Sequence, residues 1–513
     1  MKIRHLKSKD FFLDFFVLLI FLGAFFFRFY KFDTVPYGLN HDGAQDGLQA
    51  IDLILQPLPY RPYVVGGSGE TLFKYYLSFL IRAFGANVRT IKFGSTLLSF
   101  LTVPVFYFFV KELAGKKIAV FSTFLLSISG WQIIMGKTVW RAISTPLIES
   151  ALLLFLVKAI KKKKGFYFAL SGLFLSLALN TYNGARSLLF FTPLALLVVF
   201  VFFLQKKVQF REVFRYFIFF SAAFAITVYP LFNYARKNWA EFNSRFNSLS
   251  VFSQIQERKS FLPIKENLIK TALIFNVRAN GDDFFVSQPL LDAPVSWFFL
   301  CGILVCLLNF KKPIFLFAFV GLITNLLPGL LSVPNGNRNI AVMPFVYLIS
   351  GFGLNTFWFY LTRIFQKKKI LPLVIAFSIC LFGIVNTCST YIGKNRRELW
   401  GFYPETTIVG NFMKPLISEY DFYLTDNYPR DALTFLTYKD GDPFIQHYHW
   451  LETKEEFLEV ERKKKTLFIM FASEENHVFL NKLREKYPLG EKFILDYKDD
   501  NINRPAALIY KVD

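Results

Sequence analysis

Two carboxylates early in the chain stand in surroundings that suit acid–base chemistry. Asp42 lies within Asn-His-Asp-Gly-Ala-Gln-Asp at 40–46, and Glu70 follows the glycine-rich run at 66–69. A carboxylate held beside a cleft can accept a proton from an attacking hydroxyl group. Each residue also has a structural interpretation. Asp42 with Gln45 three residues later resembles a helix capping box, and Glu70 would suit the positive end of a helix.

Isolated basic side chains could complement these carboxylates by holding an anion. Five of them lie near the expected ends of apolar helices, in segments otherwise poor in lysine and arginine: Lys74, Lys137, Arg141, Arg186 and Arg338. Arginine can bind a phosphate through two parallel hydrogen bonds, whereas lysine acts as a point charge. The alternative is that each long side chain extends from the lipid to the headgroups. The sequence therefore allows either an anion site or interfacial anchoring.

The spacing of the possible metal ligands gives no indication of a metal site. All four cysteines fall inside apolar runs, without neighbours at ligand spacing. A disulfide framework is not indicated either. We therefore expect no metal and no cofactor.

The composition places these residues in a membrane protein. Hydrophobic residues make up 54% of the 513 residues, yet the formal net charge is +22. The two values agree if apolar runs lie in lipid and the basic residues lie in loops. Nucleic-acid binding is disfavoured, because the Lys/Arg clusters separate apolar runs instead of forming one basic face.

About eleven segments are long and apolar enough to cross a bilayer, which requires roughly 20 residues. The expected spans are 11–30, 93–113, 118–136, 142–160, 166–182, 187–204, 214–233, 295–310, 313–331, 340–360 and 370–390. The first run shows no small-residue cleavage site, so we expect it to be retained as a helix. The predicted fold is mainly α, a polytopic helical bundle.

Lysine and arginine cluster in alternate loops, which predicts a cytoplasmic N-terminus and a C-terminus outside. Three large segments then lie outside, at 31–92, 234–294 and 391–513. We expect a membrane catalytic domain at 1–390 and a soluble extracytoplasmic domain at 391–513. A prokaryotic plasma membrane is the expected location.

The outer segments contain elements of their own. Residues 71–85 are apolar but too short to span, and Lys74 and Arg82 share one helical face, as in a helix lying at the interface. A tilted spanning helix is the alternative. In the C-terminal segment, strand-like and helical runs alternate, which favours a small α/β domain. Strands are expected at 421–426, 466–472, 492–498 and 506–512, and helices at 454–465 and 474–487.

Six ordered blocks between about residues 10 and 360 resemble those of the GT-C fold glycosyltransferases. They are Val-Pro-Tyr-Gly-Leu-Asn-His-Asp-Gly-Ala at 35–44, Glu-Thr-Leu-Phe-Lys-Tyr-Tyr-Leu at 70–77, Gly-Lys-Thr-Val-Trp-Arg-Ala-Ile-Ser-Thr-Pro-Leu at 136–147, Asn-Thr-Tyr-Asn-Gly-Ala-Arg at 180–186, Gly-Asp-Asp at 281–283 leading to Pro289 and Asp292, and Asn-Arg-Asn at 337–339 with Pro344 in the next helix. Within that class the chain is similar to the protein O-mannosyltransferase-like superfamily, which includes lipid A aminoarabinose transferases. Gly43 stands where the family has Glu, and Thr71 where it has Pro. The lost carboxylate argues against a metal or two-acid role at Asp42.

The resemblance implies a sugar donor carried on a polyprenyl phosphate and one inverting transfer step to an acceptor hydroxyl. It implies Asp42 as general base with Glu70 in support. Lys74, Arg141, Arg186 and Arg338 would stabilise the leaving phosphate. The acceptor could be a protein, a lipid or a glycan. The alternatives are a lipid-linked sugar transporter or flippase, which would place charges inside the spans, and an envelope oligosaccharide ligase.

Overall fold

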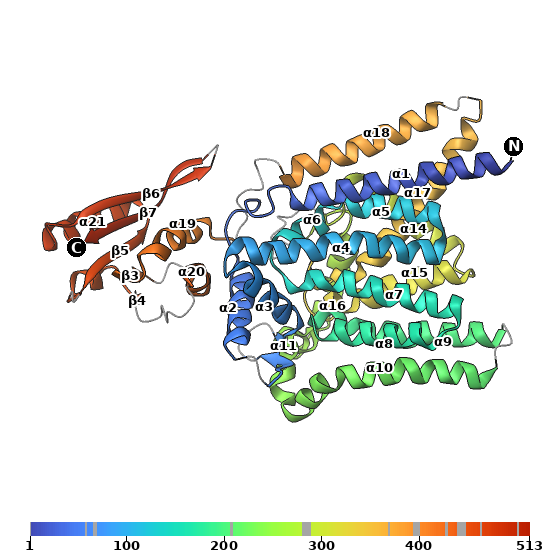
Figure 1. Ribbon diagram of the computed structural model, residues 1–513, viewed down its shortest axis with the longest axis horizontal. Helices are drawn as coiled ribbons and strands as arrows, with labels where there is room; N and C mark the ends of the chain where they lie inside the picture. Colours follow the sequence, from blue (N-terminus) through green and yellow to red (C-terminus); the bar gives the residue numbers. More distant parts are fainter. Residues whose placement is uncertain are drawn as a thin grey trace. The chain divides into compact units, whose positions relative to one another are not determined.

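The structure is a computed structural model, and it divides into two compact units (Figure 1). It describes all residues except 1, 57–58, 65–68, 206–208, 280–288, 368–369, 393–400, 426–428, 439–447, 462–463 and 500–501. Unit 1 comprises 1–32, 59–73 and 95–393, and unit 2 comprises 33–58, 74–94 and 394–513. The expected division of the chain after residue 390 stays a prediction, since unit 2 also includes 33–58 and 74–94.

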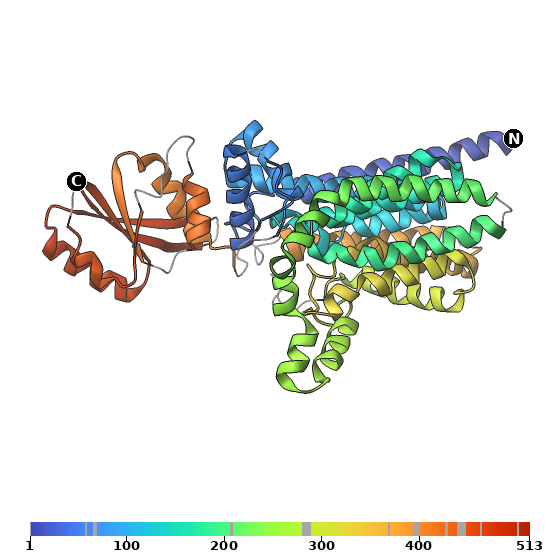
Figure 2. The same ribbon diagram turned by 90° about the horizontal axis from the view of Figure 1, so that it is seen from below.

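Unit 1 is a bundle of long helices that run alongside one another (Figures 1 and 2). Its main helices are α1 (Lys2–Phe29), α4 (Val88–Ala114, which begins in unit 2), α5 (Lys116–Ser127), α6 (Gly130–Lys137), α7 (Ser144–Lys162), α8 (Gly165–Leu179), α9 (Leu188–Gln205), α10 (Phe210–Lys237), α14 (Ala293–Leu308), α15 (Pro313–Asn325), α16 (Leu327–Leu330), α17 (Met343–Ile364) and α18 (Ile370–Thr387). Proline stands in the first turn of α14, α15 and α17, where its missing N–H costs no helical hydrogen bond.

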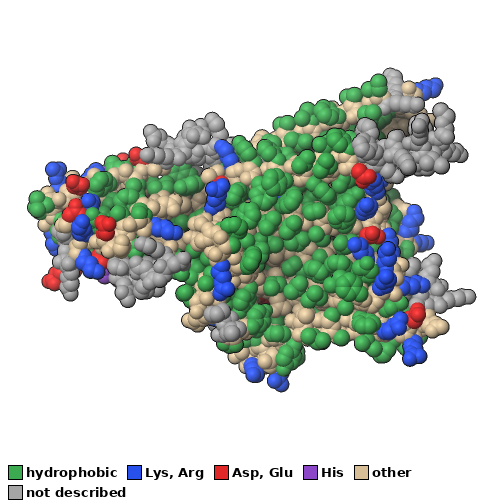
Figure 3. Space-filling view, in the orientation of Figure 1, with side chains coloured by type: hydrophobic (Ala, Val, Ile, Leu, Met, Phe, Trp, Pro, Cys, Tyr) green, Lys and Arg blue, Asp and Glu red, His purple; other side chains and the backbone are tan. Residues whose placement is uncertain are grey.

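Each of the eleven expected spans coincides with helix, but the number that crosses the membrane is not confirmed. By length and composition, six helices in the described part of the chain could span a bilayer, or seven if α5 and α6 form one bent span. Three shorter apolar helices lie in α8, α9 and α14. The surface of the bundle is largely apolar (Figure 3), with exposed side chains such as Trp297, Leu308 and Ile226. Such a surface requires lipid around it, and the chain is an integral membrane protein.

Side chains from other helices form hydrogen bonds with the backbone at the break between α5 and α6. The two helices meet at 54°, so backbone groups near Ser127 lose their helical partners. Arg28 of α1 donates to the carbonyl oxygens of Leu126 and Ser127 at 3.1 and 2.9 Å, and to the side chain of Gln132. Irregular backbone is tolerated inside a membrane where protein groups satisfy it. Arg28 is fully buried, so the break is a fixed feature of the bundle.

The backbone on the far side of the break is bonded in the same way. Asp292, which precedes α14, accepts a hydrogen bond from the N–H of Gly130 at 2.9 Å. Thr387 of α18 donates to the carbonyl oxygen of Ile128 at 2.7 Å. Three helices distant in sequence therefore determine the direction in which α6 leaves the break.

We expect Arg28→Ala to destabilise unit 1 by roughly 3–6 kcal/mol, because three buried acceptors lose their donor at about 1–2 kcal/mol each. Thermal unfolding of the purified protein in detergent measures this loss. Arg363, which lies in the last turn of α17, provides the control substitution Arg363→Ala. Equal melting temperatures for the two variants would show that the bonds at the break contribute nothing to stability.

Unit 2 joins residues 33–58 and 74–94 to the C-terminal segment. Helix α2 (His41–Leu55) packs on α20 (Arg430–Thr437), and Gly47 lies against the ring of Phe435. Gly38 adopts a positive φ of 96° close to the carbonyl oxygen of Phe402, where a side chain would collide. Helix α3 (Leu72–Phe84) confirms the helix expected at 71–85. These contacts explain why 33–58 groups with the C-terminal residues.

The C-terminal part of unit 2 is a five-stranded mixed sheet with helices. The strands are β3 (Tyr420–Thr425), β4 (Tyr448–Leu451), β5 (Lys465–Phe471), β6 (Glu491–Asp499) and β7 (Ile502–Val512), in the order β4-β3-β5-β7-β6. β3 is parallel to β4 and β5, and β7 is antiparallel to β5 and β6. The four expected strands are confirmed, whereas β4 was not expected.

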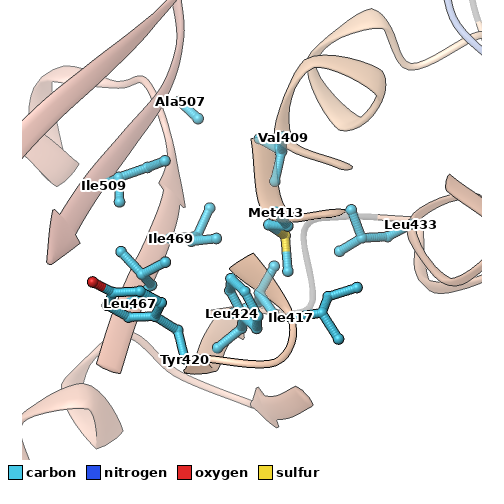
Figure 4. Packing of buried hydrophobic residues seen from close by; sticks show 11 residues of the cluster. Val409, Met413, Ile417, Tyr420, Leu424, Leu433, Leu467, Ile469, Ala507 and Ile509 are labelled. Carbon is cyan, nitrogen blue, oxygen red and sulfur yellow. The ribbon is translucent and has the colours of Figure 1, made fainter. Parts of the chain in front are cut away.

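Alternate side chains of a strand point to opposite faces of the sheet. On the central strands, the side chains of both faces are buried. Leu467 and Ile469 of β5 pack with Val409 and Met413 of α19 (Pro404–Met413) on one face (Figure 4). Phe468 and Met470 pack on the other face, in a cluster that includes Leu480 of α21 (Glu474–Lys486). Helix α21 confirms the expected helix at 474–487.

Two local expectations are wrong. The described part of 454–465 contains no α-helix, but only the short 3-10 turn Glu455–Leu458 and the first residue of β5. Asp42 does not cap α2. Asn40 is the capping residue, with extended backbone and a side chain that accepts a hydrogen bond from the N–H of Gly43 at 3.1 Å. Asp42 instead lies in the first turn, where its charge suits the helix dipole.

Candidate functional site

The segment between α8 and α9 brings several functional candidates together in unit 1. The carbonyl oxygen of Asn180 accepts a hydrogen bond from the N–H of Leu72 at 3.1 Å. A side-chain carbon at Gly184 would lie 2.5 Å from the ring of Tyr182 and 3.3 Å from the carbonyl oxygen of Arg338. Glycine is therefore needed for the close approach of these segments. The 3-10 turn η2 (Asn183–Ser187) then leads into α9.

Glu70 and Arg186 form an ion pair in this region. Glu70 ends the short strand β2 (Gly69–Glu70), which pairs with β1 (Tyr63–Val64). Its carboxylate is fully buried, and Oε1 accepts a hydrogen bond from Nη2 of Arg186 at 3.3 Å. The second oxygen, Oε2, has no hydrogen-bond partner among the described residues. The pair therefore leaves one buried acceptor available to a further donor.

The Arg186 guanidinium is held on its other side by an aromatic ring. It lies 4.2 Å from the centroid of Phe242. Phe242 in turn contacts Tyr63, with ring centroids 5.4 Å apart. The Arg186 side chain remains 27% exposed, so it is not sealed inside the bundle.

Two more of the expected cations lie around the same segment. Arg141 begins the turn η1 (Arg141–Ile143), is buried, and lies 5.8 Å from the ring centroid of Tyr182. Arg338 precedes the turn η3 (Ile340–Val342), and its Nη1 donates to the carbonyl oxygen of Val333 at 3.1 Å. Turn η3 contacts both η2 and α7. Three arginines that are far apart in sequence thus gather at the starts of α7, α9 and α17.

The remaining expected site residues belong to unit 2. Asp42 is half-buried on α2, and its neighbour His41 pairs with Asp431 at 3.2 Å. Lys74, in the first part of α3, is fully buried. Burial of Lys74 and Arg141 disfavours their anchoring at headgroups. The structure brings Glu70, Arg141, Arg186 and Arg338 into one unit, and a joint site with Asp42 and Lys74 stays a prediction. The block at 281–283 lies outside the described residues.

Comparison with known proteins identifies the fold of unit 1 and unit 2 together as one already known. The family model for the N-terminal region of oligosaccharyl transferase STT3 matches residues 50–261. Among solved structures, ArnT from Cupriavidus metallidurans bound to undecaprenyl phosphate aligns over 98% of both chains, with a TM-score of 0.57 and 11% identity. The apo state of that protein gives the same TM-score and 12% identity. The chain has the GT-C fold.

The archaeal oligosaccharyltransferase of Archaeoglobus fulgidus provides a second GT-C likeness. Its complex with a tethered acceptor peptide aligns over 97% of this chain and 74% of its own, with a TM-score of 0.53 and 13% identity. Its complex with an inhibitory peptide and a dolichol-phosphate gives a TM-score of 0.51 and 13% identity. At these identities the likeness concerns the fold. A comparison with curated proteins gave no match.

Within the GT-C bundle, one buried acid was missed by the sequence analysis. Glu149 of α7 is fully buried, and its Oε1 accepts a hydrogen bond from Asn325 at 3.3 Å. Asn325 also accepts one from Ser187 at 2.7 Å, next to Arg186. A single Glu in an apolar run has no spacing partner, and Asn325 lies 176 positions away. Only its position inside an expected span could have indicated it.

Proposed function

We propose that this chain is a membrane glycosyltransferase that moves a sugar from a polyprenyl-phosphate donor to an acceptor hydroxyl. The GT-C fold supports the proposal, since two proteins of that fold, at low identity, are structurally characterised with undecaprenyl phosphate and dolichol-phosphate. The observation that carries the proposal is that the segments carrying Arg141, Arg186 and Arg338 meet at Tyr182 and Gly184 in unit 1. Cations gathered at helix starts suit a lipid-linked phosphate.

The proposed reaction is one inverting displacement at the anomeric carbon. The acceptor oxygen attacks, the bond between that carbon and the phosphate oxygen breaks, and the acceptor proton goes to Asp42. Glu70 supports the acceptor or the base, and Lys74 with the three arginines stabilises the charge on the leaving phosphate. The step needs no redox partner, and we expect no metal to assist.

Binding of the product lipid provides the direct test. The purified protein in lipid nanodiscs should bind undecaprenyl phosphate, as measured by native mass spectrometry. Combined substitution of Arg141 and Arg338 by Gln should weaken this binding at least tenfold, because each charge-assisted hydrogen bond contributes about 1.5–3 kcal/mol. Arg363→Gln is the matched control. Undiminished binding by the double variant would remove the phosphate role of this cluster.

A transferase and a transporter would differ in the fate of the bound sugar. Incubation with a radiolabelled polyprenyl-phosphate sugar should move label to an acceptor fraction from cell envelopes. Label that crosses a vesicle membrane but stays on the lipid would favour the transporter. An acceptor that is a peptide, a lipid or a glycan would be distinguished by protease, solvent extraction and glycosidase treatment of the labelled fraction.

We also propose that the membrane domain at 1–390 carries the chemistry and that 391–513 helps to recognise the acceptor. This arrangement requires a cytoplasmic N-terminus and an outer C-terminus in a prokaryotic plasma membrane. In intact cells, a cysteine at Leu489 should react with an impermeant maleimide. A cysteine at Lys163, in the turn after α7, should react only with a permeant one. Reaction of both with the impermeant reagent would overturn the orientation.

A further inference from the structure

Between α10 and α14, unit 1 extends a helical arm, residues 236–278, that the proposed reaction does not use. It consists of α11 (Trp239–Leu249), α12 (Val251–Arg258) and α13 (Leu262–Leu273). Figure 2 shows it in yellow-green, leaving the end of α10 sideways, across the direction of the spanning helices. An element with this direction would lie along a membrane surface if the bundle crosses the membrane.

The arm exposes apolar side chains that water would not favour. Phe261 is 76% exposed, Trp239 is 65% exposed, and Leu268 and Ile269 are each about half exposed. On α13 the buried positions Pro263, Asn267 and Thr271 recur every four residues and form one face. Leu262, Leu268 and Ile269 lie away from that face with Lys265 among them, so α13 is anchored to the bundle on one side and exposes apolar side chains and a lysine on the other.

The charge of the arm and the continuation of its apolar surface into α10 indicate what covers the exposed apolar side chains. Seven Lys and Arg side chains of the arm are exposed, Lys265 and Lys270 among them, against three glutamates in the same range. The apolar surface also continues into α10, where Ile226 and Phe232 are exposed on a helix long enough to span the bilayer. Exposed apolar side chains interspersed with lysines, on a surface continuous with a lipid-facing helix, fit an anionic membrane surface.

The arm is also bonded to the arginine cluster. Asn267 donates to the carbonyl oxygens of Leu330 and Ser332, and the N–H of Val251 donates to that of Leu331 at 2.9 Å. These residues lead directly to Val333, whose carbonyl oxygen accepts from Arg338. At the other end, Phe242 of α11 lies against Arg186. The arm therefore contacts groups that hold two of the three arginines, Arg186 and Arg338.

We propose that the arm docks on anionic phospholipid headgroups of the adjacent leaflet, with Phe261 and Leu268 inserted among the acyl chains. Docking holds Phe242 and the 330–333 segment in place, and so positions Arg186 and Arg338. The positioning part rests on the proposed function, whereas the docking part does not.

Spin labels on the full chain test the docking. In a cysteine-free background, single cysteines at 261, 268 and 270 carry the label in nanodiscs of phosphatidylcholine with increasing phosphatidylglycerol. Labels at 261 and 268 should become accessible to oxygen and shielded from an aqueous nickel chelate, deeper than the label at 270. The double substitution Lys265→Gln with Lys270→Gln should raise the mole fraction of phosphatidylglycerol at which insertion is half-maximal, by about fivefold per lysine.

Three other results of the spin-label experiment would overturn the docking part of the proposal. Labels at 261 and 268 that stay accessible to the chelate exclude docking. Equal insertion without phosphatidylglycerol excludes recognition of anionic headgroups. Shielding from both agents, with dimers by mass, shows that a second copy covers the face.

The positioning of Arg186 and Arg338 by the arm is tested separately, by the binding of undecaprenyl phosphate. Phe261→Ser with Leu268→Ser should lower undecaprenyl phosphate binding in anionic nanodiscs to the level found in pure phosphatidylcholine, with an unchanged melting temperature. Full binding by this variant overturns positioning by the arm. If the wild-type chain inserts its labels but never binds undecaprenyl phosphate, the proposed function fails and the docking stands.

Discussion

Asp42→Asn should lower the rate of sugar transfer by about 10²–10⁴-fold, the usual contribution of a positioned general base. The amide has the shape of the carboxylate but cannot take up the acceptor proton. The helix should be unaffected, because Asn40 provides the cap of α2. Asp42→Ala should therefore give the same loss, since no cap is removed with the carboxylate. Transfer from a labelled polyprenyl-phosphate sugar, measured in proteoliposomes, checks both variants.

Asp52→Asn is the matched control, since Asp52 lies on the same helix. It should transfer sugar at the wild-type rate. Binding of undecaprenyl phosphate and the amount of protein in the membrane should be unchanged in all three variants. Normal transfer by Asp42→Asn would end the assignment of Asp42 as base, and Glu70 and Asp46 would be the next carboxylates to substitute.

The helices of unit 1 could be predicted because apolar runs bounded by basic clusters are a strong local pattern. The break at Ser127 could not, since nothing in 118–136 interrupts the apolar run strongly. The break exists because Arg28, Asp292 and Thr387 supply donors and acceptors from other helices. In unit 2, β4 was missed because Tyr448–Leu451 is short and only half-buried, so it carries little apolar alternation.

The cap of α2 shows how two local patterns can compete. Asp42 with Gln45 and Asn40 with Gly43 have the same three-residue spacing, and only the backbone conformation decides between them. The extended φ and ψ of Asn40 place the helix start two residues before the predicted position.

The candidate cations could be selected from the sequence, but their grouping could not. Arg141, Arg186 and Arg338 were chosen singly, as basic residues in segments poor in charge. Arg141 lies by the ring of Tyr182, the backbone of Arg338 approaches Gly184, and Arg186 follows in the same turn η2, an arrangement that depends on how the turns before α7, α9 and α17 meet. The pairing of Glu70 with Arg186 likewise joins positions 116 residues apart, which no spacing rule connects.

Arg186→Ala should weaken undecaprenyl phosphate binding by about 10–100-fold, as expected for loss of a charge-assisted hydrogen bond of about 1.5–3 kcal/mol. It should also lower the melting temperature, because the buried Glu70 carboxylate loses its cation. Arg186→Lys keeps the charge without the planar fork, and should bind the lipid at an intermediate level. Native mass spectrometry measures the binding, and thermal unfolding measures the stability.

The double variant Arg186→Ala with Glu70→Gln separates the two effects. Replacing the buried carboxylate by a neutral amide removes the unpaired charge, so the melting temperature should recover most of the loss. Lipid binding should stay low, because the donor to the phosphate is still missing. Glu70→Gln alone should retain lipid binding, since Arg186 is then released from its ion pair and still stacked on Phe242. If binding recovers together with the melting temperature in the double variant, Arg186 serves only to neutralise Glu70, and Arg141 and Arg338 alone remain as phosphate partners in unit 1.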